Sequence, residues 1–318
     1  MKNTHFKMID LSIVVPAYNE EKNVILLHRK VKEILKPLNI SHEIIFIDDG
    51  SKDNTYQDLE RIHKKDKKVK IIKFKRNFGK AAALSAGFEL AQGNLILTMD
   101  ADLQDDPREI PRFLNKLNKG YDIVVGWKYK RKDPYITKVI PSKIFNLLVR
   151  KLTKIKLHDS DCNFRLMKKE ILNDLTIYGG LYRYIPSLTA SKGYRLGEIK
   201  VRHNPRRHGK SKFGFLRLFK GSFDLITIKY LISYSQSPLY FFGGIGLFFE
   251  TIGILLGFYL TYLKFILGET IGNRPLLLLV VLLIILGIQL ISLGLIAEMI
   301  TNTHKKSAKN YLIKNILK

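Results

Sequence analysis

Short apolar runs alternate with helical patterns over the first part of the chain. Apolar runs of strand length lie at residues 11–16, 43–47, 69–74, 95–99 and 122–125. Patterns typical of amphipathic helices lie between them, at residues 21–35, 53–64, 80–92 and 107–118. The last helix has a clear start signal, because Asp106 stands at the N-cap position directly before Pro107. This alternation predicts an α/β domain with a mostly parallel sheet covered by helices on both faces.

Two long apolar segments follow, at residues 238–267 and 275–297. Each is long enough to cross a hydrocarbon core of about 30 Å at about 1.5 Å per helical residue. Only residues 268–274 separate them, so the pattern predicts a transmembrane hairpin whose outer ends face the same side. Basic residues flank these outer ends, at Arg202, Arg206, Arg207, Lys210, Lys212, Arg217, Lys220, Lys229, Lys305, Lys306, Lys309 and Lys314. We therefore expect a multi-pass protein of the cell membrane, with the N-terminal domain and both termini in the cytoplasm.

Two stretches, residues 136–157 and 212–230, mix apolar with basic side chains. Helices of this kind lie in the head-group layer of a membrane, although a helix that packs on a protein core gives the same pattern. The chain is accordingly expected to have four parts. They are an α/β domain at 1–210, an interfacial amphipathic region at 211–236, the transmembrane hairpin at 237–300 and a basic cytoplasmic tail at 301–318.

Charge and cysteine content narrow the classes of partner. The chain carries 54 basic and 28 acidic residues, a formal net charge of +26. Such an excess favours anionic partners, namely nucleic acid, lipid head groups or phosphorylated substrates, although solvation by lysine also explains part of it. The single cysteine, Cys162, excludes an internal disulfide and fits a reducing compartment.

Acidic residues stand where three of the expected strands end. The first strand leads to Glu20, the second to Asp48 and Asp49, and the fourth to Asp100 and Asp102. Carboxyl ends of parallel strands meet at one edge of a sheet, where such folds bind ligands. A turn or cap accounts for one acidic residue of this kind, whereas three strands in one domain favour a site. Because clustered carboxylates need a counter-ion, and an Asp-x-Asp turn offers hard oxygen ligands, we expect Mg²⁺ or Mn²⁺ there.

The phosphate-binding loops of other α/β folds are missing from the sequence. No Gly-x-Gly-x-x-Gly follows the first strand, and no Walker-type loop is present. A diphosphate held through a metal ion is therefore the expected ligand.

Four motifs together make the chain recognisable. They are Val-Pro-Ala-Tyr-Asn-Glu at 15–20, Asp-Asp-Gly-Ser-Lys-Asp-Asn-Thr at 48–55, Arg-Asn-Phe-Gly-Lys at 76–80 and Met-Asp-Ala-Asp-Leu-Gln at 99–104. Over residues 11–214 the chain resembles family 2 glycosyltransferases of the GT-A fold. It is similar in particular to the polyisoprenyl-phosphate branch, which includes dolichyl-phosphate mannose synthase and bacterial undecaprenyl-phosphate glucosyltransferases. The hairpin resembles that of members with two transmembrane helices.

The resemblance implies roles for particular residues. The nucleotide-sugar is expected at Pro16, Tyr18, Glu20, Ile47, Asp49, Lys80, Asp100, Ala101, Asp102, Gln104, Lys128, Arg206 and Lys212. The metal is expected at Asp100, Asp102 and Gln104, the acceptor phosphate at Lys128, Lys143 and Arg165, and catalysis at Asp100, Asp102 and Asp159. The chain departs from the family at Lys128, where relatives often have Arg, and at Cys162 and Asn163, where many have Gly-Asp or Gly-Ser.

The implied reaction is metal-dependent, inverting transfer of a hexose from a nucleotide-sugar to a membrane polyisoprenyl phosphate. UDP-glucose is the first candidate donor and GDP-mannose the second. Because the acceptor phosphate is already mostly dianionic near neutral pH, its attack needs positioning and charge shielding rather than a strong base. The expected partners are the donor, the lipid and the membrane, without nucleic acid, and the sequence leaves homo-oligomers open.

Two alternatives remain at this point. A processive polysaccharide synthase of the same superfamily would carry a Gln-x-x-Arg-Trp motif, whereas the only tryptophan here, Trp127, stands in another context. A basic membrane-tethered module that binds lipid or nucleic acid through charge alone would leave the acidic strand ends unexplained.

Overall fold

The structure is a computed structural model that describes residues 9–129, 140–153, 155, 157–175, 181–202, 204, 216–235, 237–272 and 275–305. Within these ranges the side chains of residues 140–145, 216–222, 224, 304 and 305 are not described. The chain separates into two units, Met1–Leu225 and Ile226–Lys318, and each is described by itself. The division falls inside the region expected to be interfacial.

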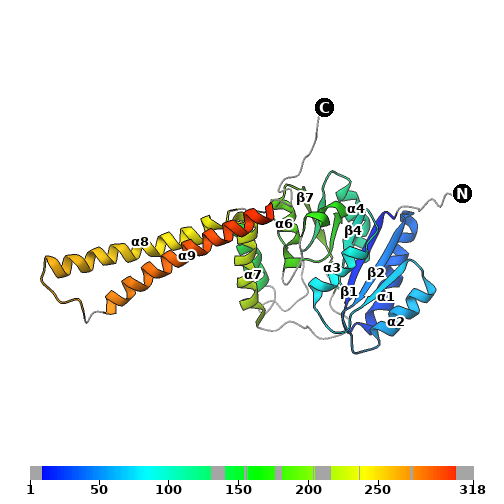
Figure 1. Ribbon diagram of the computed structural model, residues 1–318. Helices are drawn as coiled ribbons and strands as arrows, with labels where there is room; N and C mark the ends of the chain where they lie inside the picture. The colour runs from blue at the N-terminus through cyan, green and yellow to red at the C-terminus, as the bar shows by residue number, and fades with distance from the viewer. Residues whose placement is uncertain are drawn as a thin grey trace. The chain divides into compact units, whose positions relative to one another are not determined.

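A seven-stranded sheet forms the centre of the first unit (Figure 1). Its strands are β1 (Leu11–Ala17), β2 (His42–Asp48), β3 (Val69–Lys73), β4 (Leu95–Thr98), β5 (Ile123–Lys128), β6 (Arg165–Lys168) and β7 (Leu196–Val201). They are ordered β3-β2-β1-β4-β6-β5-β7, and only the two pairings of β6 are antiparallel. The expected, mostly parallel sheet is confirmed, and its first five strands lie where the apolar runs predict them.

Strands β6 and β7 were not predicted from the sequence. β6 is only four residues long and follows the polar segment that contains Asp161 and Asn163. β7 reads Leu-Gly-Glu-Ile-Lys-Val, in which charged residues interrupt the apolar ones. Neither strand has the apolar run by which a buried strand is recognised.

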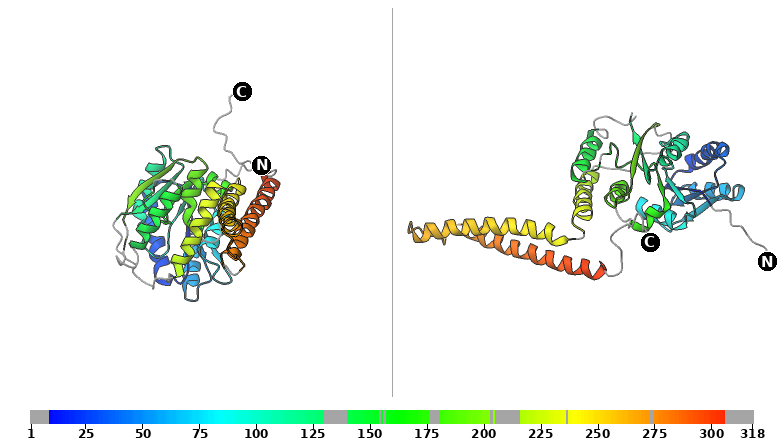
Figure 2. Two further views of the ribbon diagram at one scale, coloured as in Figure 1. Left: turned by 90° about the vertical axis from the view of Figure 1, so that its left-hand side faces the viewer. Right: turned by 90° about the horizontal axis from the view of Figure 1, so that it is seen from above.

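Helices cover both faces of the sheet. They are α1 (Glu21–Leu35), α2 (Thr55–Lys65), α3 (Lys80–Leu90), α4 (Ile110–Leu117), α5 (Ile140–Thr153) and α6 (Ile185–Ser191), with short 3₁₀ turns η1 (Lys36–Leu38), η2 (Pro107–Glu109), η4 (Lys169–Asp174) and η5 (Leu181–Tyr184). Figure 2 shows α1 and α4 on one face and α3 and α6 on the other. The predicted start at Asp106 is confirmed, because its carboxylate accepts the Arg108 N–H, although the first turn is the 3₁₀ helix η2.

The core of this unit explains why the strand ends are held firmly. β1 and β2 are buried on both faces, with Val14, Val15, Ile45 and Phe46 fully inaccessible to solvent. Such apolar strands are typical of a parallel sheet between two helical layers. The polar residues that follow these strands therefore extend from a rigid base.

The second unit contains two long helices, α8 (Pro238–Phe265) and α9 (Pro275–Lys305), preceded by α7 (Leu216–Ser233), which crosses the boundary between the units. Both α8 and α9 are long and apolar enough to cross a membrane. Their backbones approach closely, since a Cβ added at Gly246 would lie 2.7 Å from the Gly287 carbonyl oxygen. Many of their large apolar side chains point outward, among them Phe258 (69% exposed) and Leu278 (75%).

Candidate functional site

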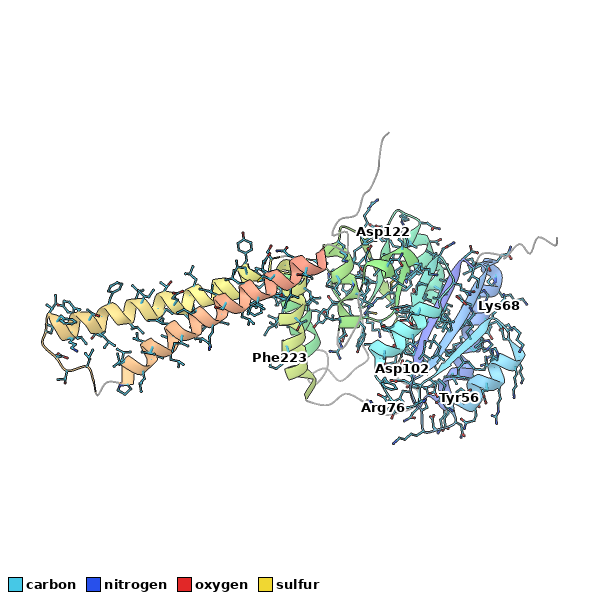
Figure 3. All side chains as sticks on the ribbon, in the orientation of Figure 1. Tyr56, Lys68, Arg76, Asp102, Asp122 and Phe223 are labelled. Atoms are coloured by element: carbon cyan, nitrogen blue, oxygen red, sulfur yellow. The ribbon has the colours of Figure 1, made fainter. Side chains whose placement is uncertain are left out.

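Three strand ends that carry acidic residues lie side by side. β2, β1 and β4 are neighbours in the sheet and run parallel, so residues after Asp48, Ala17 and Thr98 emerge at one edge. Figure 3 shows Asp102 at this edge together with Arg76 and Tyr56, and Asp122 at the opposite end of the sheet. The predicted convergence of the motifs is therefore confirmed.

The turn from Asp100 to Asp105 is tightly held. Leu103 is buried at its centre with a φ of 62°, a conformation that is unfavourable for a bulky side chain. The carboxylate of Asp102 accepts the Gln104 N–H at 3.1 Å, and that of Asp105 accepts the Asp100 N–H at 3.2 Å. The Gln104 carbonyl accepts the Asn204 N–H at 3.0 Å. Strain maintained by surrounding contacts is typical of a functional turn.

Two lysines face this turn. Lys80 Nζ lies 2.6 Å from Asp100 Oδ1, and Lys128 Nζ lies 3.0 Å from Asp105 Oδ1. Burial raises the pKa of the Asp100 carboxyl, but the charges of Lys80 and Lys128 outweigh it, so the pKa lies below its ordinary value. Burial lowers the pKa of Lys128, but the Asp105 carboxylate outweighs it, so the pKa lies well above its ordinary value. The Asp100 carboxyl is therefore ionised and the Lys128 amine protonated at neutral pH.

The antiparallel strand β6 brings a further residue to the same place. Because β6 runs against β4 and β5, it begins at the edge where they end, with Arg165 beside Thr98 and Val125. Asn163, just before the strand, donates from Nδ2 to Asp100 Oδ1 at 2.9 Å. Asp105 and Asn163 are the two site residues that sequence reasoning missed. The signals were the third aspartate of the turn, Asp105, and the departure from the family at Asn163.

Arg165, expected at the acceptor phosphate, is fully buried. Its Nε donates to the Cys162 carbonyl and its Nη1 to the Tyr182 carbonyl, each at 2.6 Å. In this structure it ties the 162–165 segment to η5, which is the geometry of a positioning residue.

Asp159 is buried beside the same segment, and its main-chain N–H donates to Glu198 Oε1 at 3.3 Å. Burial raises the pKa of Cys162 to about 12, so this thiol stays protonated and is no nucleophile at neutral pH.

The residues expected at the nucleoside lie in the last residues of β1 and β2 or directly after these strands. Pro16, Tyr18 and Glu20 are half-buried, and Ile47 is fully buried inside β2. Asp49 is buried, and its carboxylate accepts the Phe78 N–H at 2.7 Å and the Gly79 N–H at 3.0 Å. Asp49 thereby fixes the segment that leads into Lys80. The structure thus brings the Asp49 and Lys80 motifs together.

Three expected site residues cannot be placed. Arg206 and Lys212 lie outside the described residues, as does the side chain of Lys143 in α5. Ala101 is buried within the Asp-x-Asp turn, and Gln104 is half-buried at its end.

The residues present fit a hard divalent cation that arrives with a ligand. Among the described residues there is no group of three or more His, Cys, Asp or Glu that could hold a metal ion by itself. Mg²⁺, however, is usually bound by one or two carboxylates together with water and substrate phosphates. Asp100 and Asp102 supply two such carboxylates, so they would hold the metal jointly with a diphosphate.

Comparison with known proteins agrees with this geometry. Residues 12–176 match the family model described as "Glycosyl transferase family 2". The chain is 36% identical to dodecaprenyl-phosphate galacturonate synthase of Rhizobium johnstonii, over 99% of this chain and 95% of that protein. It is 32% identical to undecaprenyl-phosphate 4-deoxy-4-formamido-L-arabinose transferase of Aeromonas hydrophila. That match covers 100% of this chain and 96% of the relative.

A solved structure has the same fold. Glucosyl-3-phosphoglycerate synthase from Mycobacterium tuberculosis, in complex with Mn²⁺, UDP and glucosyl-3-phosphoglycerate, superposes with a TM-score of 0.53 at 18% identity. The match covers 70% of this chain and 80% of that protein.

Proposed function

This chain belongs to glycosyl transferase family 2, and from that premise we propose that it transfers a sugar from a nucleotide-sugar to a membrane polyprenyl phosphate. The two relatives, which match over nearly their whole length, are named for dodecaprenyl-phosphate and undecaprenyl-phosphate products or acceptors. That acceptor class is the one implied by the sequence motifs.

The observation that carries the proposal is the strained turn at the end of β4. In this turn Asp100 is paired with Lys80, and Asp105 is paired with Lys128. Asp102 accepts the Gln104 N–H within the same turn. A nucleoside diphosphate leaving group carries negative charge that grows as the sugar departs, so it needs cations beside it. When bound at Asp100 and Asp102, Mg²⁺ or Mn²⁺ would supply most of that charge. The Mycobacterium tuberculosis protein of the same fold was solved with Mn²⁺ and UDP, which supports the use of a divalent metal with this fold in general.

The other described residues then have defined tasks. The Asp49 carboxylate holds the main chain at Phe78 and Gly79 and so shapes the donor side of the site. The cationic side chains that shield the phosphate charge are Lys80 and Lys128. The 159–165 segment is ordered by the hydrogen bonds of Asp159 and Arg165. Attack by the acceptor phosphate oxygen on the anomeric carbon, opposite the departing diphosphate, inverts the anomeric centre. The acceptor needs no strong base, because its phosphate is already largely ionised.

The identity of the transferred sugar is tested by experiment. UDP-glucose and GDP-mannose remain the proposed donors, whereas the two relatives are named for galacturonate and 4-deoxy-4-formamido-L-arabinose. Membranes that contain the protein are incubated with radiolabelled nucleotide-activated forms of all four sugars, with and without Mg²⁺ or Mn²⁺. We expect one labelled lipid whose mild acid hydrolysis releases the sugar. Label in a polymer, or in no lipid with any donor, would contradict the proposal.

Anchoring in a membrane suits an enzyme whose acceptor is a lipid phosphate. The two candidate spans, α8 and α9, would anchor the enzyme where a polyprenyl phosphate lies, and we propose that the catalytic unit faces the cytoplasm. A module that binds lipid or nucleic acid through charge alone is set aside, since the family and both relatives are enzymes. No described residue favours a processive polysaccharide synthase. Label in a polymer, in the donor experiment above, would distinguish such a synthase from the proposed transferase.

A further inference from the structure

We propose that Lys80 is a resident counter-cation of Asp100 that moves to the donor's diphosphate, so that metal binds tightly only together with the nucleotide. This inference rests on the proposed function, because it assumes that metal and diphosphate share the turn. It adds a property that the proposed function does not require, namely that the free enzyme resists loading with metal.

The contacts of Asp100 support this role. One oxygen, Oδ1, receives both Lys80 Nζ at 2.6 Å and Asn163 Nδ2 at 2.9 Å. A metal ion that approaches this carboxylate alone meets a positive ammonium group already bound to it. Lys80 therefore competes with the metal at the same carboxylate rather than at a distance.

The surroundings of Lys80 let its ammonium group move while its backbone stays fixed. The preceding Gly79 N–H is held by Asp49 at 3.0 Å, and Lys80 is the first residue of α3. Its side chain is 26% exposed, and that of Asp100 is 29% exposed. A flexible four-carbon stem on a fixed backbone can carry the ammonium group from the carboxylate to a nearby phosphate oxygen.

The charges of the turn explain the coupling. Lys80 is paired with Asp100, and Lys128 is paired with Asp105. A divalent cation alone would therefore add to a turn whose charge is already largely balanced. A diphosphate brings further negative charge to the turn. That charge attracts the Lys80 ammonium group away from Asp100, and it also attracts the metal ion to the turn. Because such coupling is reciprocal, the nucleotide must raise metal affinity by the factor by which the metal raises nucleotide affinity.

The test measures Mn²⁺ binding rather than turnover. The full-length protein in detergent is titrated with Mn²⁺, and free Mn²⁺ is followed by electron paramagnetic resonance, without nucleotide and with UDP or GDP. We expect wild-type protein to bind Mn²⁺ at least tenfold more tightly when one of the two nucleotides is present. Lys80→Met should bind Mn²⁺ alone at least tenfold more tightly than wild type and gain much less from the nucleotide. Lys80→Arg, which keeps the cation, should behave like wild type.

A second lysine provides the matched control. Lys168 Nζ lies 2.7 Å from Asp122 Oδ1 at the opposite end of the sheet, so Lys168→Met removes a similar ion pair away from the turn. It should leave Mn²⁺ binding unchanged, and thermal unfolding of all variants checks their folding. If Lys80→Met binds Mn²⁺ alone within twofold of wild type, or more weakly, the proposal is overturned. It is also overturned if neither nucleotide promotes Mn²⁺ binding. Failure of the proposed function appears separately, as the absence of sugar transfer by wild-type protein.

Discussion

At the scale of single residues, the candidate site contains carboxylates that are close in sequence and differ in their contacts. Asp100 is bound by Lys80 and Asn163, whereas Asp105 is buried against Lys128 and holds the Asp100 main-chain N–H. Asp102 accepts the Gln104 N–H and so shapes the turn itself. The same residue type thus serves as a proposed metal ligand and as a support for that ligand.

Asp102→Asn should abolish sugar transfer and leave the fold intact. Asparagine keeps the size of the side chain but removes the negative charge that would hold the metal. We expect turnover to fall at least about a hundredfold, which corresponds to about 2.7 kcal/mol of transition-state stabilisation. The measurement is transfer of labelled sugar at saturating metal. The control is Asp10→Asn, at an exposed aspartate directly before β1. Near wild-type turnover of Asp102→Asn would remove the metal assignment.

Gly50→Ala should weaken donor binding. Gly50 has a φ of +70°, and an added Cβ would lie 2.4 Å from the carbonyl carbon of Arg76, so the main chain at 76–77 must shift. That segment leads to the Phe78 and Gly79 amides held by Asp49. We expect KM for the nucleotide-sugar to rise about tenfold, about 1.4 kcal/mol.

The matched control is Gly193→Ala, with a φ of +91° and nothing within 4 Å of the added Cβ. Gly193→Ala also places a side chain at a positive φ, but without the collision. An equal change of KM in both variants would show that the position of the 76–79 segment is not what matters.

At the scale of elements, a buried glutamate joins four segments at the end of the sheet remote from the site. Glu43, in β2, accepts the Ser12 hydroxyl of β1 at 2.5 Å and the Gln92 N–H at 2.6 Å, and Lys70 of β3 lies 2.6 Å away. Burial raises the pKa of the Glu43 carboxyl, but the hydrogen bonds from Lys70 and Ser12 outweigh it, so the pKa lies below its ordinary value. The carboxylate therefore stabilises the fold when it is ionised.

Glu43→Gln should reduce the sensitivity of the fold to acid. Because the folded pKa is lowered, the stabilisation is complete above the ordinary value of about 4.3 and is lost as pH falls through the folded pKa. Wild type should therefore lose more thermal stability than the variant between pH 5 and about pH 3. Glu33→Gln, at a side chain that is 66% exposed, should leave this slope unchanged. Parallel pH profiles for wild type and Glu43→Gln would contradict the linkage.

The pairing of α8 and α9 is a second property of elements. A Cβ added at Gly287 would lie 2.8 Å from the Gly246 carbonyl oxygen, so the two backbones leave no room for a side chain. Small residues that allow such an approach are typical of helix pairs in membranes. Gly287→Leu should lower the melting temperature of the hairpin in detergent, as followed by helical circular dichroism. Gly244→Leu, where an added Cβ meets nothing within 4 Å, should not. Equal melting of the two variants would contradict close packing at Gly287.

At the scale of the whole molecule, the distribution of charge and apolar length predicts the membrane topology. The two candidate spans are separated by a short connection, and basic residues flank their outer ends. We therefore expect a protease added outside intact cells to cut neither a tag at Met1 nor a tag at Lys318. Both tags should be cut once the membrane is opened. External cleavage of either tag would overturn the proposed orientation.

The sequence by itself determined the alternating α/β pattern, the acidic strand ends and the two apolar helices. These features depend on local periodicity and on motifs whose residues are close along the chain. That Asp100 and Asp102 lie together in one turn could be predicted for this reason, because their spacing keeps them together whatever the rest of the fold does. The same holds for α1, whose predicted bounds 21–35 match the structure.

Only the tertiary structure decided how the site is completed. Asn163 and Asp100 are 63 residues apart in sequence, and they meet because the antiparallel strand β6 lies between β4 and β5. β6 has too few apolar residues to show a period, and its place depends on pairing with strands already in the sheet. The burial of Arg165 and the pairing of Lys128 with Asp105 follow from that insertion. Long-range strand order, which no local pattern encodes, therefore decides which charges face the Asp-x-Asp turn.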